Sequence, residues 1–106
     1  MSSESSFKSI WEYEVRDKYR AEFIEAYSPN GLWANLFKQC EGYIKTELLH
    51  DCEHPNRFLT IDYWQSQSVF SRMKQIIKDE YTRLDEQCEA YTWSENHMGF
   101  FHNERN

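Results

Sequence analysis

The chain has 106 residues and a formal net charge of −6, with 12 lysines and arginines against 18 acidic residues. A chain of this length forms one domain around a single core. Nucleic acids and anionic membranes need clustered positive charge, so the acidic balance argues against both as partners. No apolar stretch approaches the roughly 20 residues of a membrane helix, and residues 1–6 do not resemble a signal peptide, so we expect a cytoplasmic protein.

The cysteine and aromatic contents narrow the class further. Cys40, Cys52 and Cys88 are odd in number and lack CxxC spacing, which favours free thiols in a reducing compartment over disulfides. Aromatic residues make up 17% of the chain. We expect these rings either to fill the core or to line a ligand cavity or subunit interface.

The first half of the chain predicts a strand, two helices and a second strand. Residues 7–16 alternate between apolar and polar side chains, which indicates a strand. Asp17 is a candidate N-cap for a helix that ends at residues 28–31, a turn-forming stretch with proline and glycine. A short amphipathic helix is predicted over 32–39. The second strand begins at Gly42 and runs to about Leu49.

The second half predicts a hairpin strand, a long helix and a last strand. Residues 51–56 are rich in turn formers, and 57–64 are rich in β-branched and aromatic residues. Ser66 can cap a long helix, because apolar residues recur at steps of three and four from 69 to 88. The charged residues of that helix, including Lys74 and Asp85, are predicted to form a solvated face. Residues 93–101 form the last strand.

This order of elements predicts an α+β, ferredoxin-like split βαβ domain over residues 7–101, with a four-stranded antiparallel sheet. Residues 1–6 and 102–106 are predicted to be a disordered N-terminal tail and a frayed C-terminal tail. The helices cover one sheet face, yet the strands carry bulky apolar residues on both faces. A homodimer would bury the second face through one symmetric contact.

Several blocks in order resemble the antibiotic biosynthesis monooxygenase family, in an uncharacterised bacterial branch. The blocks are Phe23 with Tyr27, Gly31-Leu32-Trp33, Leu36-Phe37, Gly42-Tyr43, Thr46-Glu47-Leu48, residues 60–66 (TIDYWQS), Phe70, Tyr81 and Leu84-Asp85. The resemblance implies a dimeric α+β barrel with a ligand cavity between sheet and helices. Some members of the family oxidise aromatic substrates with molecular oxygen and no metal or flavin.

The chain departs from two branches of that family. Members that oxidise polyketide phenols pair the strand Trp, here Trp64, with an Asn and a Tyr, where this chain has Thr60 and Phe70. Two polar groups that would orient a phenolate are therefore replaced. The heme-degrading branch has a Trp and a heme-ligating His where ungapped counting places Met73 and Arg83. Residues 66–90 contain no histidine, so we expect no heme cofactor of that type.

Candidate site residues each have a structural and a functional interpretation. Asp62, on the same strand face as Trp64, is either a satisfied buried carboxyl or a general base with a raised pKa. His97 on the last strand either faces the cavity as a base or lies on the dimer surface. Residues predicted to bind the substrate, for which core packing is the competing interpretation, are Trp64, Trp33, Phe37, Phe70 and Thr60.

The predicted function is binding of a small aromatic or apolar molecule, with Asp62 or His97 deprotonating it for cofactor-independent oxidation by oxygen. The alternative is a noncatalytic binding homodimer of the same fold. A heme-binding protein is the third interpretation. His50, Cys52 and His54 lie close together in a turn but match no zinc spacing, so no metal site is predicted.

Overall fold

The computed structural model describes residues 6–104, so most of the predicted N-terminal tail and the last two residues of the C-terminal tail lie outside the described residues. The main elements follow the predicted order. They are β1 (Phe7–Val15), α1 (Arg20–Tyr27), α2 (Leu32–Phe37), β2 (Tyr43–His50), β3 (Arg57–Trp64), α3 (Gln67–Ile76), α4 (Lys78–Cys88) and β4 (Thr92–Phe101), with 3-10 turns at Asp17–Tyr19 and Glu89–Tyr91.

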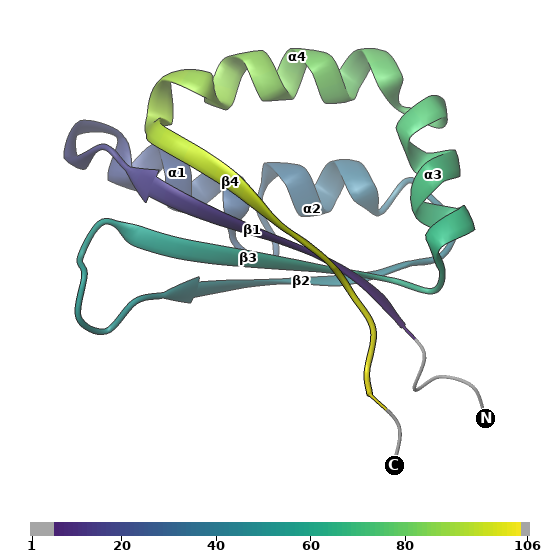
Figure 1. The fold of residues 1–106 in the computed structure, drawn as a ribbon. Coiled ribbons are helices and arrows are strands. Elements are labelled where there is room, and N and C mark those ends of the chain that lie inside the picture. The colour runs from purple at the N-terminus through teal and green to yellow at the C-terminus, as the bar shows by residue number, and fades with distance from the viewer. Residues whose placement is uncertain (1–5, 105–106) are drawn as a thin grey trace.

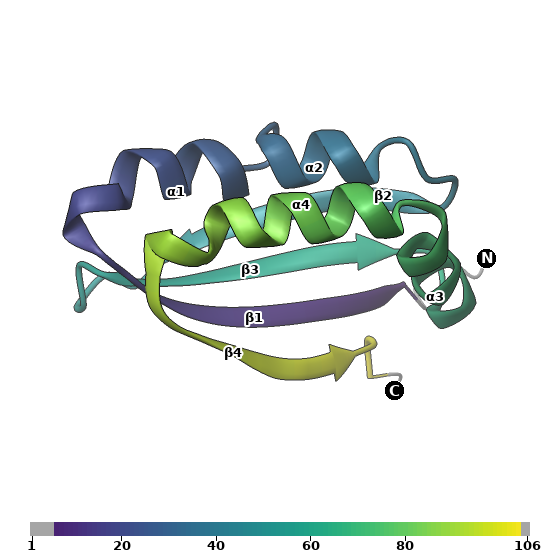
Figure 2. The ribbon, with the colours of Figure 1, turned by 90° about the horizontal axis from the view of Figure 1, so that it is seen from above.

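The four strands form one antiparallel sheet in the order β2-β3-β1-β4. Figure 1 shows the helices on one side of this sheet, and the view from above in Figure 2 shows α1, α2 and α4 lying along the strands with α3 at one end. The α+β ferredoxin-like fold predicted from the order of elements is therefore confirmed. No helix covers the second face of the sheet within residues 6–104.

Alternation along β3 decides which side chains enter the layer between sheet and helices. Phe58, Thr60 and Trp64 are all buried there, with at most 3% of their surface exposed. Leu59 and Ile61 point to the other face and remain partly exposed. This two-residue period is the one that the sequence predicts for a strand, and it places Asp62 on the helix side of the sheet as well.

The prediction of one long helix is wrong, because the helix is interrupted at Ile77. This residue has φ −110° and ψ 30°, outside helical geometry, and α4 begins at the next residue. Both Met73 and Ile77 are buried, so the break turns the chain while keeping both side chains in the core. The apolar residues keep their helical spacing through the break, so the periodicity of the sequence does not reveal it. None of the helices described is long and apolar enough to span a membrane.

The predicted helix starts have different outcomes. Ser66 is confirmed as the N-cap of α3, since the Val69 backbone N–H donates to its Oγ at 3.2 Å. Asp17 is not an N-cap, because it lies inside a 3-10 turn and α1 begins at Arg20 without a side-chain cap. The 3-10 turn replaces the first helical turn that the sequence predicts.

Candidate functional site

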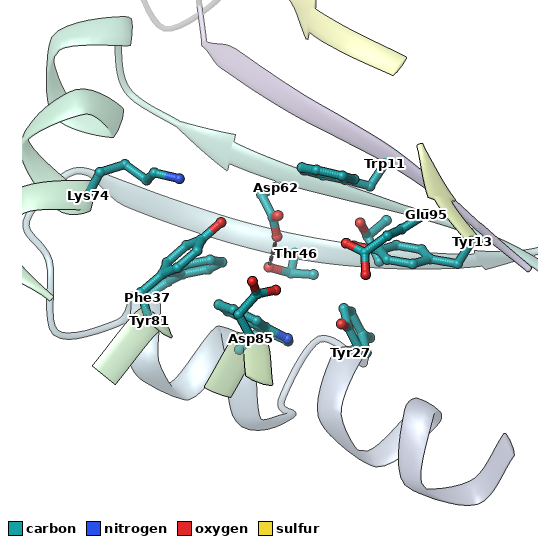
Figure 3. Close-up of a pocket in the computed structure, with 12 residues that line it drawn as sticks. Trp11, Tyr13, Tyr27, Phe37, Thr46, Asp62, Lys74, Tyr81, Asp85 and Glu95 are labelled. Atoms are coloured by element: carbon teal, nitrogen blue, oxygen red, sulfur yellow. Dashed lines mark hydrogen bonds between the residues drawn. The ribbon is translucent and has the colours of Figure 1, made fainter. Parts of the chain in front are cut away.

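A cavity lies between the sheet and the helices, with a volume of about 270 Å³. Its floor comes from all four strands and its roof from all four helices. Figure 3 shows aromatic rings and charged groups surrounding the same space. The aromatic side chains that line this first chamber are Trp11, Tyr13, Tyr27, Trp33, Phe37 and Tyr81. The polar and charged ones are Thr46, Thr60, Asp62, Lys74, Asp85 and Glu95.

A second chamber of about 340 Å³ continues from the first toward the end of the sheet. The two chambers share Trp11, Phe37, Asp62, Lys74 and Tyr81, so they form one continuous cavity. The second chamber adds further side chains from β1, β4 and α3. They are Ser9, Phe70, Met73, His97 and Phe100. Together the chambers reach the size of small-molecule sites.

Strand register builds the polar part of the cavity floor. Asp62 on β3 lies directly across from Thr46 on β2 and from Ser9 on β1. In the next row Thr60 pairs with Trp11, which in turn pairs with His97 on β4. Residues at these register positions share one face of the sheet. Four separate strands therefore contribute polar groups to one floor.

Asp62 is the carboxyl that this arrangement affects most. Thr46 Oγ1 donates to Asp62 Oδ1 at 2.6 Å. The Thr46 hydroxyl has only one proton, so Tyr43 OH, which lies 2.7 Å from Thr46 Oγ1, donates to it in turn. Burial raises the pKa of Asp62 to about 6, although the Thr46 hydrogen bond favours the charged form. Asp62 can therefore bind and release a proton near neutral pH.

His97 lies in the second chamber with one direct polar partner. Its Nε2 is 3.2 Å from Ser9 Oγ, and Ser9 is almost fully buried. The ring packs against Trp11 and Phe100, with centroids 4.8 and 4.6 Å away. Burial, followed by the positive charge of Lys74, lowers the pKa of His97. A neutral imidazole of this kind can accept a proton at neutral pH.

Most of the predicted site residues meet around the cavity. Thr60, Asp62, Trp33 and Phe37 line the first chamber. Phe70 and His97 line the second, which Asp62 and Phe37 also reach.

Trp64 has a different position from the other predicted site residues. It is fully buried and is not among the described side chains that line the two chambers. Its ring contacts Phe37, Tyr43 and Phe70 at centroid distances of 5.1, 5.2 and 5.7 Å. The predicted ligand contact of Trp64 stays a prediction, and the packing of its neighbours is its visible role.

The charged groups at the cavity were not predicted as site residues. Lys74 and Asp85 belong to the helical surface that the sequence indicates as solvated, yet both line the first chamber with Glu95. The side chains of Lys74 and Asp85 are exposed to solvent, as predicted. They lie where the solvated face of the helices meets the cavity. Helical periodicity does not predict which part of a polar face meets the rim of a cavity.

Other floor residues could have been found by strand alternation. Trp11 and Tyr13 occupy alternate positions of β1, and both line the first chamber. On β4, Glu95 and His97 line the cavity, but Gly99 does not continue this alternation. The register shifts between Ile10 and Trp11, so Gly99 pairs with Ile10 and His97 with Trp11. A β-bulge of this kind moves the following residues to the other face.

His50 at the end of β2 and His54 in the turn that follows make local contacts. His50 stacks on Phe58 with centroids 4.4 Å apart. His54 Nδ1 lies 3.1 Å from Asp51 Oδ2. The three cysteines are free. Within residues 6–104, no three His, Cys, Asp or Glu side chains are arranged to hold a metal ion.

The fold and cavity together define a class of small α+β proteins that enclose a cavity between a four-stranded sheet and its helices. No protein-family model matches the sequence, and no curated protein matches it either. Solved structures do match over nearly the whole chain. SnoaB, a cofactor-independent oxygenase from Streptomyces nogalater, has 15% identity and a TM-score of 0.71 over 96% of each chain.

Two further solved structures carry related names. A candidate antibiotic biosynthesis monooxygenase from Nitrosomonas europaea has 13% identity and a TM-score of 0.70, covering 92% of this chain and 89% of its own. Another from Bordetella bronchiseptica has 13% identity and a TM-score of 0.68, covering 96% and 98%. This chain therefore has the fold of the antibiotic biosynthesis monooxygenase proteins, and the predicted resemblance is confirmed at the level of fold.

Proposed function

We propose that this protein binds a small aromatic or apolar molecule in the cavity and oxidises it with molecular oxygen without a cofactor. The observation that carries the proposal is Asp62, a carboxyl with a pKa of about 6 that lies inside an aromatic cavity. A base is most useful when its pKa lies near the working pH. The name of SnoaB, a cofactor-independent oxygenase of the same fold, supports this reaction class.

The proposed reaction begins with the removal of a proton from the substrate. Asp62 accepts a proton from an acidic hydroxyl or C–H group, and His97 in the second chamber is the alternative base. The resulting anion is electron-rich and supplies the electrons that reduce oxygen. One oxygen atom becomes a carbonyl on the substrate ring and the other leaves as water, so a hydroxyarene and O2 give a quinone and water. The aromatic walls hold the ring in place and exclude water, which favours a fixed geometry for this step.

Oxygen uptake with a panel of naphthols and hydroquinones tests this reaction. We expect Asp62→Asn to reduce kcat by about 100-fold, because a positioned general base contributes about 10²–10⁴-fold. The asparagine oxygen can still accept the Thr46 hydrogen bond, so ligand affinity should change little. Glu86→Gln, an exposed change on α4, is the matched control and should retain full activity. Unchanged kcat in Asp62→Asn would exclude Asp62 as the base.

The second candidate function is binding without catalysis. It is favoured by Thr60 and Phe70, which replace the two polar residues that the phenol-oxidising relatives are expected to carry. Phe70 lines the second chamber with an apolar ring, so position 70 itself offers no hydroxyl to orient a phenolate. Panel compounds that bind at micromolar concentration while oxygen uptake stays at background would support this candidate over the enzyme.

We also propose that the protein is a homodimer formed through the uncovered face of the sheet. Ile61 on β3 lies at the middle of this face, beside Ile10 on β1 and Glu47 on β2. Leu49 and Phe101 are each 44% exposed on the flanking strands. Apolar groups spread across one open sheet face indicate a surface that a second copy can bury.

Light scattering coupled to size exclusion tests the dimer. We expect twice the chain mass for the wild type at micromolar concentration and a shift to monomer for Ile61→Glu. The new carboxylate would be buried in the interface and would face Glu47 at its register position. Ile76→Glu is the control, because Ile76 is 59% exposed on α3 and lies away from the open face. A monomeric wild type would contradict the proposal.

A further inference from the structure

The charged groups of the first chamber are unbalanced. Three carboxylates, Asp62, Asp85 and Glu95, line it together with a single cation, Lys74. None of these three forms an ion pair with a lysine, arginine or histidine in the described part of the chain. Three carboxylates against one ammonium group leave a net negative potential in the space that they line.

The carboxylates face the same space. Figure 3 shows the acidic groups of Asp85 and Glu95 directed into the pocket from opposite layers, with Lys74 at the other end. Burial, and then the nearby charges of Asp85 and Glu89, raise the pKa of Glu95. Lys74 Nζ lies 4.3 Å from the centroid of the Tyr81 ring, so its charge is already placed against an aromatic face.

Two buried polar atoms in the lining lack a partner, which is a separate sign of an absent ligand. Thr60 is 3% exposed and Trp33 is 7% exposed, and both line the first chamber. Within residues 6–104, Thr60 Oγ1 and Trp33 Nε1 have no hydrogen-bond partner. The Tyr13 hydroxyl lies within weak hydrogen-bonding reach of Thr60, as do the Tyr27 hydroxyl and the Cys88 thiol of Trp33, but none of these contacts has the distance and angle of a full hydrogen bond. Unsatisfied buried groups of this kind are uncommon in native proteins.

From these observations we infer that the cavity selects an aromatic or apolar molecule that carries a protonated amine. The ammonium group would lie between Asp85 and Glu95, where aromatic faces add cation–π attraction. The hydroxyl of Thr60 can accept a hydrogen bond from it, and Trp33 N–H can donate to an oxygen of the ligand. This inference rests on the proposed function, since it specifies the ligand of the same cavity.

Calorimetric titration with three matched probes tests the inference. The probes are 2-(aminomethyl)naphthalene as the cation, 2-(hydroxymethyl)naphthalene as the neutral analogue and 2-naphthoate as the anion. We expect the amine to bind about tenfold more tightly than the alcohol, and the anion to bind most weakly. This ratio reflects partly exposed charges, whose individual contributions are modest, together with the aromatic contacts.

The double variant Asp85→Asn with Glu95→Gln should lose the preference for the amine while its affinity for the alcohol stays the same. Glu86→Gln on α4 is the control for net charge and should keep the preference. Equal binding of amine and alcohol by the wild type would overturn the inference and leave the proposed binding function intact. Failure of all three probes to bind the folded protein would overturn both.

Discussion

Replacing Trp64 with alanine should reduce the free energy of unfolding by about 3–5 kcal/mol, the usual cost of truncating a buried Trp. The side chain is fully buried. The rings of Phe37, Tyr43 and Phe70 contact it edge-on, at centroid distances of 5.1 to 5.7 Å. Removing Trp64 would leave a cavity that these rings cannot fill. Urea unfolding followed by far-UV circular dichroism measures the loss.

Two matched variants separate the packing of Trp64 from its indole N–H. Trp64 Nε1 has no partner among the described residues, so Trp64→Phe removes an unsatisfied group and should cost less than alanine. Trp93→Ala is the exposed control, since Trp93 is 70% exposed and contacts the Arg16 guanidinium at 4.5 Å. A loss below about 1 kcal/mol for Trp64→Ala would contradict the central packing role.

The second large effect is the dependence of stability on pH that Asp62 imposes. Its pKa is about 6 in the folded protein against an ordinary value of 3.8, so the folded state binds more protons than the unfolded state between these values. The free energy of unfolding therefore falls as pH rises from about 4 to about 6, and the loss is complete above pH 6. Two pKa units correspond to about 3 kcal/mol, and because Asp62 is only partly buried, solvent screening reduces this to about 1–3 kcal/mol.

The variant Asp62→Asn isolates this contribution. Asparagine does not titrate, so we expect the variant and wild type to have similar stability near pH 4 and the variant to be more stable by about 1–3 kcal/mol at pH 7. Urea titrations at several pH values give the difference curve, in which the other titrating groups cancel. Glu86→Gln should run parallel to the wild type. If Asp62→Asn also runs parallel, the pKa of Asp62 is not raised.

These predictions reveal how far local patterns reach in this chain. The two-residue period of residues 57–64 placed Thr60, Asp62 and Trp64 on one face of a strand, and the structure confirms that face. Turn formers located the hairpin before Arg57, and Ser66 located the start of α3. Strand alternation and capping act over a few residues, so one sequence contains enough information to recognise them.

Features that depend on contacts between distant parts of the chain could not be predicted from local patterns. The break at Ile77 preserves the apolar spacing of a continuous helix, so only the packing of Met73 and Ile77 into one core reveals the turn. The bulge that separates Gly99 from His97 arises from pairing between β4 and β1. A periodic pattern contains no record of a register shift in a partner strand.

The sequence alone determined the fold class, the order of strands and helices, and the face that carries Asp62, because these follow from side-chain periodicity and turn chemistry. Only the tertiary structure decided which of these residues meet. Strand pairing brought Thr46 to Asp62 and Ser9 to His97, and helix packing brought Asp85 over the sheet beside Glu95. It also placed Trp64 in the core, outside the cavity lining described, since the rings around it occupy the intervening space.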